Sequence, residues 1–174
     1  GMLISKPEIW NRLMKKLADM SIEYLSMQAR AGANALQIFD SWVGAVNSTE
    51  YEQAIFPHMK RIISTVKSRF PNLPLAMNGV GTDHLVSTWA KLPLDVIALD
   101  WRSSLGAAKD RGVTQTVQGN LDPAYLYGDT KTIAKVVDEI LMDGVRHGKH
   151  VFNLGHGVFP EADPAKLHWL TDYV

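Results

Sequence analysis

The sequence predicts an α/β fold that is part of a (β/α)8 TIM barrel, with about five parallel strands and flanking helices. Three observations support this fold class. Short apolar runs alternate with amphipathic helical patterns, which is the order of a parallel sheet with right-handed crossovers. The apolar runs are nearly continuous, as expected of strands buried on both faces. Polar side chains follow directly after these runs, where barrel proteins build their sites.

The composition indicates one domain of moderate size. The chain has 174 residues and is 46% hydrophobic, which supports a single core, so we expect one domain over residues 3–174. Residues 1–2 are interpreted as an expression scar or start. The 18 basic residues balance the 18 acidic ones, so we expect no nucleic-acid partner and no membrane partner. The absence of cysteine and of a long apolar run fits a cytoplasmic protein.

A long amphipathic helix is predicted first. Ser5 and Glu8 have the S-x-x-E spacing of a capping box, Pro7 suits a first turn, and Gly32 ends the helix. Apolar side chains recur at steps of three and four residues and are predicted to form its buried stripe. These residues are Leu13, Leu17, Met20, Tyr24 and Met27.

The first strand is predicted at residues 35–39, an apolar run that a polar loop follows. The next helix begins in the T-x-x-E spacing of Thr49 to Glu52 and continues to Phe70. Pro57 lies inside this pattern, so it must kink or restart the helix.

Two further strands, at residues 74–77 and 95–99, each precede a short helix. Thr82 is the predicted cap of the first of these helices, which continues to Leu92. The second short helix is predicted at residues 105–109.

The last units follow the same alternation. A strand is predicted at residues 113–117, a helix at residues 130–145 and a strand that starts at His150. Gly148 ends that helix, and a final helix begins after Pro164.

Five strands in 174 residues are too few for a closed barrel, which needs eight strands and roughly 250 residues. We therefore expect a piece of a longer barrel. A doubly wound open sheet is the alternative, but it usually has a glycine-rich loop after its first strand, and this chain has Asp40-Ser41-Trp42 there. The polar residues at the predicted strand ends are Asp40, Ser41, Asn78, Asp100, Gln118, Asn120, Asp122 and His156.

His156 is the first candidate site residue. It lies between Gly155 and Gly157 directly after the last predicted strand, and the glycines let another molecule approach the backbone closely. A loop histidine without a role is the alternative.

Four segments together resemble the uroporphyrinogen decarboxylase family in order and spacing. They are Leu36 to Gly44 (LQIFDSWVG), Val96 to Arg102 (VIALDWR), Val117 to Pro123 (VQGNLDP) and Val151 to Gly157 (VFNLGHG). The resemblance covers nearly all of residues 3–174 and assigns them to the fourth to eighth strands of the family's barrel, in its C-terminal portion. Where the family usually has a lysine after its fifth strand, this chain has Met77-Asn78-Gly79.

The resemblance implies a carboxy-lyase that uses no cofactor. Such an enzyme removes the acetate carboxyls of uroporphyrinogen III to give coproporphyrinogen III in porphyrin and heme biosynthesis. The catalytic aspartate and a carboxylate-binding arginine loop belong to the portion of the family that this chain does not match, so no catalytic residue is assigned and the piece alone is expected to be inactive. Ser41 and His156 match substrate-binding positions, and Phe39 either packs on the tetrapyrrole or belongs to the core.

Other polar residues receive structural interpretations. Asp100 and Asp122 are expected to anchor loops around the cavity. The spacing of His147 and His150 permits a metal pair, but no carboxylate cluster accompanies them, so a solvated helix end is preferred and no metal site is predicted.

Two other functions are kept as alternatives. One is a corrinoid-linked zinc methyltransferase, which shares the barrel superfamily but uses cysteine ligands that this chain lacks. The other is a non-catalytic fragment. In either case, the open edges and the apolar inner face expected of a partial barrel predict a homodimer.

Overall fold

The computed structural model describes residues 1–174 and contains one five-stranded sheet. Its strands are β1 (Leu36–Phe39), β2 (Leu75–Asn78), β3 (Val96–Ala98), β4 (Thr116–Leu121) and β5 (His150–Leu154). They lie side by side in sequence order, and each neighbouring pair is parallel. A doubly wound sheet reverses its strand order at a switch point. The sequential order therefore confirms the barrel-type arrangement and excludes the doubly wound alternative.

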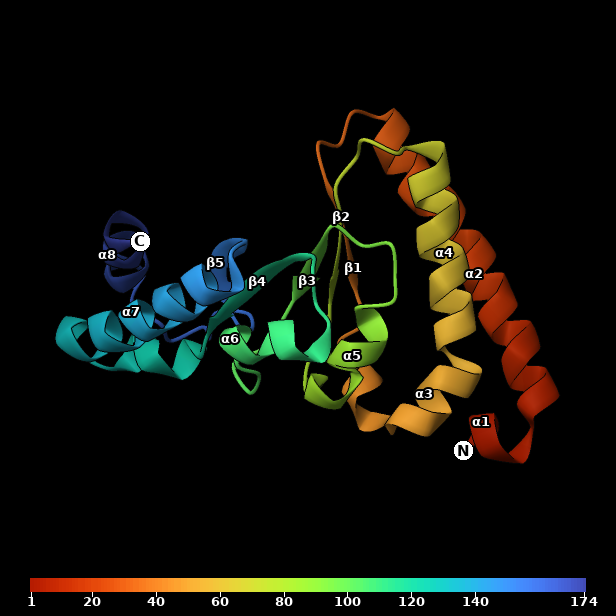
Figure 1. Ribbon diagram of the computed structural model, residues 1–174, viewed down its shortest axis with the longest axis horizontal. Coiled ribbons are helices and arrows are strands. Elements are labelled where there is room, and N and C mark those ends of the chain that lie inside the picture. The colour runs from red at the N-terminus through yellow and green to blue at the C-terminus, as the bar shows by residue number, and fades with distance from the viewer.

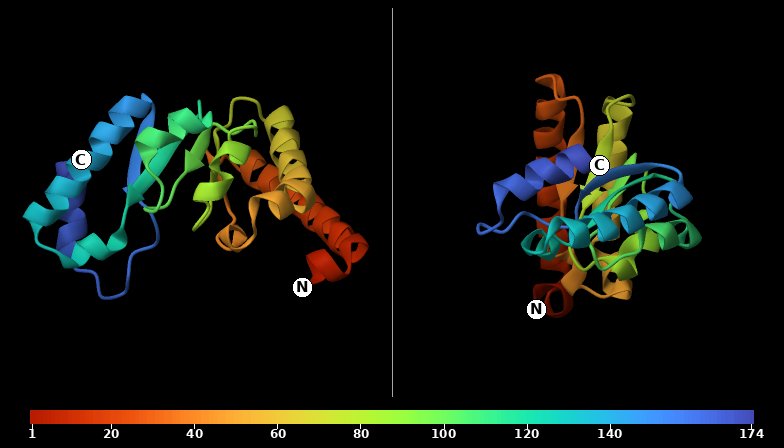
Figure 2. Two further views of the ribbon diagram at one scale, coloured as in Figure 1. Left: turned by 60° about the horizontal axis from the view of Figure 1, so that its bottom comes forward. Right: turned by 90° about the vertical axis from the view of Figure 1, so that its left-hand side faces the viewer.

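Helices connect the strands. They are α1 (Met2–Ser5), α2 (Pro7–Arg30), α3 (Ser48–Ala54), α4 (Phe56–Arg69), α5 (Val86–Trp89), α6 (Leu105–Ala108), α7 (Thr130–His147) and α8 (Pro164–Tyr173). In Figure 1, α2 and α4 lie side by side at one end of the molecule, α7 and α8 lie at the other, and the strands are between them. Figure 2 shows the two ends of the chain at α1 and α8, on opposite sides of the sheet. None of the helices has the length and the apolar content that a membrane span requires.

The core lies between the sheet and these helices. Alternate strand residues such as Met77, Ile97 and Val117 are fully buried against the helices and belong to a cluster of 24 buried residues. Each such side chain contributes about 1.5–3 kcal/mol to stability. A smaller cluster of five residues lies between the end of β4, α7 and α8.

The opposite face of the sheet is less apolar than predicted. The residues that alternate with the buried set include three carboxamides, Gln37, Asn78 and Gln118, and all three are partly exposed. A strand whose second face borders a polar cavity does not need apolar residues on both faces. The expectation of a uniformly apolar inner face was therefore wrong.

The long N-terminal helix is confirmed, but its buried stripe is not the predicted one. Ala18, Ile22 and Leu25 are buried, whereas the five predicted core residues, Leu13, Leu17, Met20, Tyr24 and Met27, are 40–62% exposed. The helix thus has two apolar stripes. Figure 1 shows that α4 covers one side of α2 and leaves the other side open.

The two predicted capping boxes were wrong, although the helices they predicted exist. Ser5 is the last residue of α1, and Lys6 precedes α2 without a side-chain cap. The cap of α3 is Asn47, whose side chain accepts a hydrogen bond from Glu50 N at 2.9 Å. Thr82 makes no capping bond either. Pro57 restarts the helix as predicted, because α4 begins at Phe56.

The fourth strand begins three residues later than predicted and is longer. Residues 116–121 form β4, so Gln118 and Asn120 lie within the strand and not in the loop after it. The register confirms this, since Asn120 pairs with Asn153 and Leu121 with Leu154. The predicted strand ended too early because Gln118 and Asn120, near the end of β4, are polar.

Candidate functional site

A cavity of about 420 Å³ lies at the C-terminal ends of the strands. We call it the strand-tip cleft. Its lining comes from β1, from β2, from the loops that follow both strands and from the end of β5 with its loop. These residues are Gln37, Phe39, Ser41, Asn78, Val80, Asn153, Leu154, Gly155, His156, Gly157 and Val158.

The strand-tip cleft shows that the sheet is curled. β1 and β5 are its two edges. In a flat sheet, four spacings of about 4.8 Å would hold these edges roughly 19 Å apart. Ser41 follows β1 and His156 follows β5, yet both line the same cavity. The expectation that the two residues face one cleft is therefore confirmed, whereas their role in binding stays a prediction.

The loop after β1 positions Ser41. Asp40 N donates a hydrogen bond to Asn78 O at 2.8 Å and extends the pairing of β1 with β2 by one residue. Val43 N then donates to Asp40 O at 3.3 Å, which forms a turn with Ser41 exposed at its tip. Gly44 packs so closely on the next loop that a Cβ there would overlap the backbone oxygen of Val80.

Three contacts position His156. Gly155 N donates to Leu121 O at 2.7 Å and holds the start of the loop against β4. A Cβ on Gly155 would lie 2.6 Å from Trp101 N, so only glycine lets the two loops approach this closely. The Trp101 and His156 rings meet edge to face, with centroids 6.0 Å apart and planes at 86°. The imidazole itself is exposed to the cleft.

Asp100 anchors the loops beneath the cleft, as predicted. Its side chain is only 1% exposed and accepts hydrogen bonds from Gly81 N, from Arg102 N at 2.9 Å and from Arg102 Nη1 at 2.9 Å. Its backbone oxygen accepts from Asn120 Nδ2 at 2.8 Å. One residue therefore joins the loops after β2 and β3 to β4. Asp122 has a smaller role, since it caps a turn by accepting from Ala124 N at 2.9 Å.

Phe39 borders two cavities. It lines the strand-tip cleft and also an apolar cavity of about 720 Å³ between α2, α4 and β1. The side chain is 69% exposed, so the alternative that Phe39 belongs to the core was wrong. Asp40 lines the apolar cavity, and burial raises the pKa of its carboxyl above the usual value.

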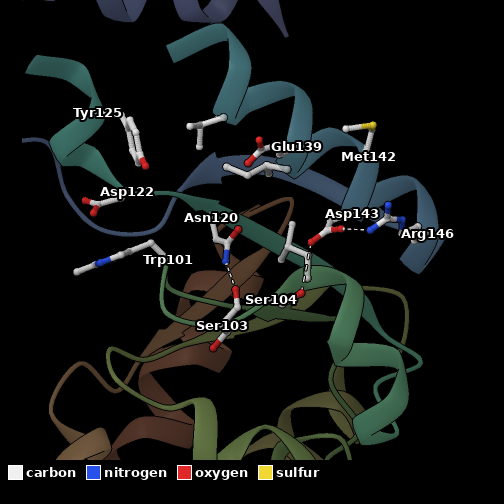
Figure 3. A pocket seen from close by; sticks show the side chains of 13 residues that line it. Trp101, Ser103, Ser104, Asn120, Asp122, Tyr125, Glu139, Met142, Asp143 and Arg146 are labelled. Atoms are coloured by element: carbon white, nitrogen blue, oxygen red, sulfur yellow. Dashed lines mark hydrogen bonds and ion pairs between the residues drawn. The ribbon is translucent and has the colours of Figure 1, made fainter. Parts of the chain in front are cut away.

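A second polar cavity, of about 520 Å³, lies between the loops after β3 and β4 and the helices α6 and α7 (Figure 3). Trp101 borders it and also contacts His156. Many of its polar groups are already paired, because Asp143 binds Arg146 at 2.9 Å and Asn120 binds the backbone oxygen of Ser103. None of the predicted substrate-binding residues lines it. Trp101 was not among the predicted site residues, although it follows Asp100 in the VIALDWR segment.

The two histidines considered as a metal pair contact backbone oxygens instead of a shared metal position. The ring of His147 contacts Gln115 O at 2.8 Å, and the ring of His150 contacts Gly119 O at 2.6 Å. His147 is 8% exposed, so the preferred interpretation as a solvated helix end was wrong. No group of three or more His, Cys, Asp or Glu side chains is arranged to hold a metal ion.

Comparison with known proteins first defines the fold. A methyltransferase from Methanosarcina mazei superposes with a TM-score of 0.82 at 18% identity, over 99% of this chain and 50% of that one. At this identity the likeness shows a shared barrel-type fold and no more. The family model for uroporphyrinogen decarboxylase (URO-D) matches residues 1–174. The chain therefore belongs to the uroporphyrinogen decarboxylase family.

Curated relatives agree with this family. The chain is 50% identical over 172 residues to uroporphyrinogen decarboxylase from Geobacillus sp. (strain WCH70), covering 99% of this chain and 49% of the relative. It is 50% identical over 174 residues to the protein of that name from Oceanobacillus iheyensis, covering all of this chain and 50% of the relative. The chain thus spans about half the length of the curated relatives it matches.

Proposed function

We propose that this chain forms the substrate cleft of a uroporphyrinogen decarboxylase. The reaction removes the acetate carboxyls of uroporphyrinogen III and yields coproporphyrinogen III in porphyrin and heme biosynthesis. The observation that carries the proposal is that Ser41 and His156, from opposite edges of the sheet, line one cavity in a chain of this family. A cytoplasmic location and the lack of a nucleic-acid partner stay predictions.

The chemistry of the strand-tip cleft suits a carboxylate. The Ser41 hydroxyl and a ring N–H of His156 can each donate a hydrogen bond to a carboxylate oxygen. No Asp or Glu lines the cavity, so no carboxylate of this chain contacts an acidic arm of the substrate there. The exposed ring of Phe39 offers an apolar face for the macrocycle at the same opening.

The cavity volume sets how much of the substrate this chain contacts. Ligand sites commonly measure about 300–1,000 Å³, and the strand-tip cleft, at about 420 Å³, is near the lower limit. It therefore receives one part of the tetrapyrrole with its acidic arms. The open side next to Phe39 leaves room for the rest of the ring.

We also infer that the chain self-associates, most economically as a homodimer. β1 and β5 are unpaired edges, and edge strands promote association. Large apolar side chains near β1 are exposed, among them Met20, Tyr24 and Trp42, and Trp42 is 87% exposed. In sedimentation velocity at micromolar concentration we expect a species larger than the monomer. A species that stays monomeric and binds no hydrophobic dye would contradict this.

The test of the proposed function is the binding of uroporphyrin III, the air-stable oxidised form of the substrate, followed by its fluorescence. Loss of one hydrogen bond to a charged group costs about 1.5–3 kcal/mol, so Ser41→Ala and His156→Ala should each weaken binding at least about ten-fold. Matched controls are Ser87→Ala on α5 and His168→Ala on α8, both exposed and outside the cleft. Equal affinity of all five proteins would contradict the proposal.

The methyltransferase alternative rests on a shared fold alone, since the Methanosarcina mazei protein is 18% identical, and no group of three or more metal-ligating side chains supports it. It predicts bound zinc. Elemental analysis of protein purified without chelators separates the two functions, because the proposed decarboxylase needs no metal. One zinc ion per chain would favour the alternative.

A further inference from the structure

The strand-tip cleft contains five side chains that can form hydrogen bonds, and none of them is a lysine, arginine or carboxylate. They are Gln37, Ser41, Asn78, Asn153 and His156. Any anion held here is therefore held mainly by neutral donors. A neutral donor binds a carboxylate through a hydrogen bond, whose strength depends on its distance and angle. Each donor without another partner can therefore add to the binding of the anion.

Asn78 offers a free side-chain donor on a fixed backbone. It is the last residue of β2 and pairs with Phe39 of β1. Its backbone oxygen accepts a hydrogen bond from Asp40 N at 2.8 Å, which fixes the backbone at the floor of the cleft. The side chain is half-buried and lines the cavity, and its amide makes no hydrogen bond within the protein. A side-chain amide that starts from a fixed backbone, faces the cavity and has no partner in the chain is available to a ligand.

The other asparagines at the strand ends are paired in part or in full. Asn153 Oδ1 accepts a hydrogen bond from Leu154 N at 2.8 Å. Asn120 is buried and donates to the backbone oxygens of Asp100 and Ser103. Figure 3 shows the Asn120 amide beside Ser103, in the second polar cavity. Asn153 thus keeps a free Nδ2–H group, whereas Asn120 does not, and of the three only Asn78 has both its oxygen and its amide N–H group without a partner in the chain.

We propose that Asn78 is a third substrate-contacting residue, whose Nδ2–H donates a hydrogen bond to a carboxylate of the acidic tetrapyrrole. The proposal rests on the proposed function. Ser41 follows β1, Asn78 ends β2 and His156 follows β5, so the three donors surround the cavity from separate elements. Donors on three sides select a ligand with several acidic arms over one with a single carboxylate.

The carboxamide could bind in two ways, and one substitution separates them. In the proposed way, Nδ2–H donates to a carboxylate. In the other, Oδ1 accepts from a pyrrole N–H. Asn78→Asp keeps the size and the acceptor Oδ1 but replaces the donor Nδ2 by a second acceptor oxygen and adds a negative charge. It should repel an acidic arm and weaken binding more than Asn78→Ala, whereas an acceptor role would be preserved in Asn78→Asp.

The experiment measures uroporphyrin III binding to the 174-residue chain and its variants by fluorescence titration. We expect Asn78→Ala to weaken binding about ten-fold and Asn78→Asp to weaken it further. Asn72→Ala is the matched control, because Asn72 is exposed and precedes β2 at the opposite end of the strand. Thermal unfolding of each variant verifies that the fold is retained.

Three outcomes would overturn the inference, and they differ in what they imply. If Asn78→Ala binds within two-fold of the unaltered chain while Ser41→Ala and His156→Ala bind weakly, Asn78 is not a contact and the proposed function stands. If Asn78→Asp binds as well as the unaltered chain, the donor role is wrong. If uroporphyrin III binds none of the proteins, both proposals fail.

Discussion

Replacing Asp100 by alanine tests how the strand-tip cleft is supported. The carboxylate accepts three hydrogen bonds while only 1% exposed. The Arg102 side chain is 50% exposed and can turn to water, but the backbone N–H groups of Gly81 and Arg102 would lose their acceptor. An unsatisfied buried donor costs about 1–3 kcal/mol, and because these two N–H groups are only part-buried, we expect a destabilisation in the lower half of their summed range, about 3 kcal/mol.

Thermal unfolding followed by circular dichroism measures this loss. For a chain of 174 residues, each kcal/mol lowers the Tm by about 2–4 °C, so Asp100→Ala should lower it by roughly 6–12 °C. Asp110→Ala is the matched control, because Asp110 is exposed and should change stability by less than about 0.5 kcal/mol. A fall of under about 2 °C for Asp100→Ala would refute the view that this carboxylate anchors the loops.

Three further predictions concern the Asp40 carboxyl, the close approach at Gly155 and the activity of the chain alone. Burial raises the pKa of the Asp40 carboxyl above 3.8. The folded state therefore binds this proton more tightly than the unfolded state does. The stability that the protonated carboxyl contributes is lost as the pH rises above 3.8. Asp40→Asn should therefore have a higher Tm than the unaltered chain at pH 7, with the gap closing below about pH 3.8; a gap that does not change with pH would contradict this. Gly155→Ala should cost about 1–3 kcal/mol and weaken uroporphyrin III binding, because its Cβ would overlap Trp101 N, whereas Gly157→Ala has open space and should leave stability unchanged. The 174-residue chain alone should form no coproporphyrinogen above a heat-killed control, because it spans about half of its relatives.

The sequence predicted the order of strands and helices well. Each strand contains or borders an apolar run between glycine, proline or polar signals, and local periodicity records that pattern directly. The buried side of α2 was mispredicted because the helix has two apolar stripes, and only the position of α4 decides which is covered. Tertiary placement of this kind leaves no signal in the spacing of one segment.

The site was predicted in part. The motifs with Ser41 and His156 placed both residues after strands, and barrel topology then placed them on one cleft. The support of His156 by Gly155 and Trp101 could not be predicted, because it depends on two loops 54 residues apart that meet only through the curl of the sheet. The free amide of Asn78 was equally hidden, since a sequence does not show which polar groups lack partners.

A crystal structure of the chain with uroporphyrin III tests the central claim most directly. It should show a carboxylate of the ligand within about 2.7–3.2 Å of both Ser41 Oγ and a ring nitrogen of His156, with part of the macrocycle on Phe39. Ligand density only in the second polar cavity, next to Tyr125 and Trp101, would contradict the assignment of the strand-tip cleft as the substrate site.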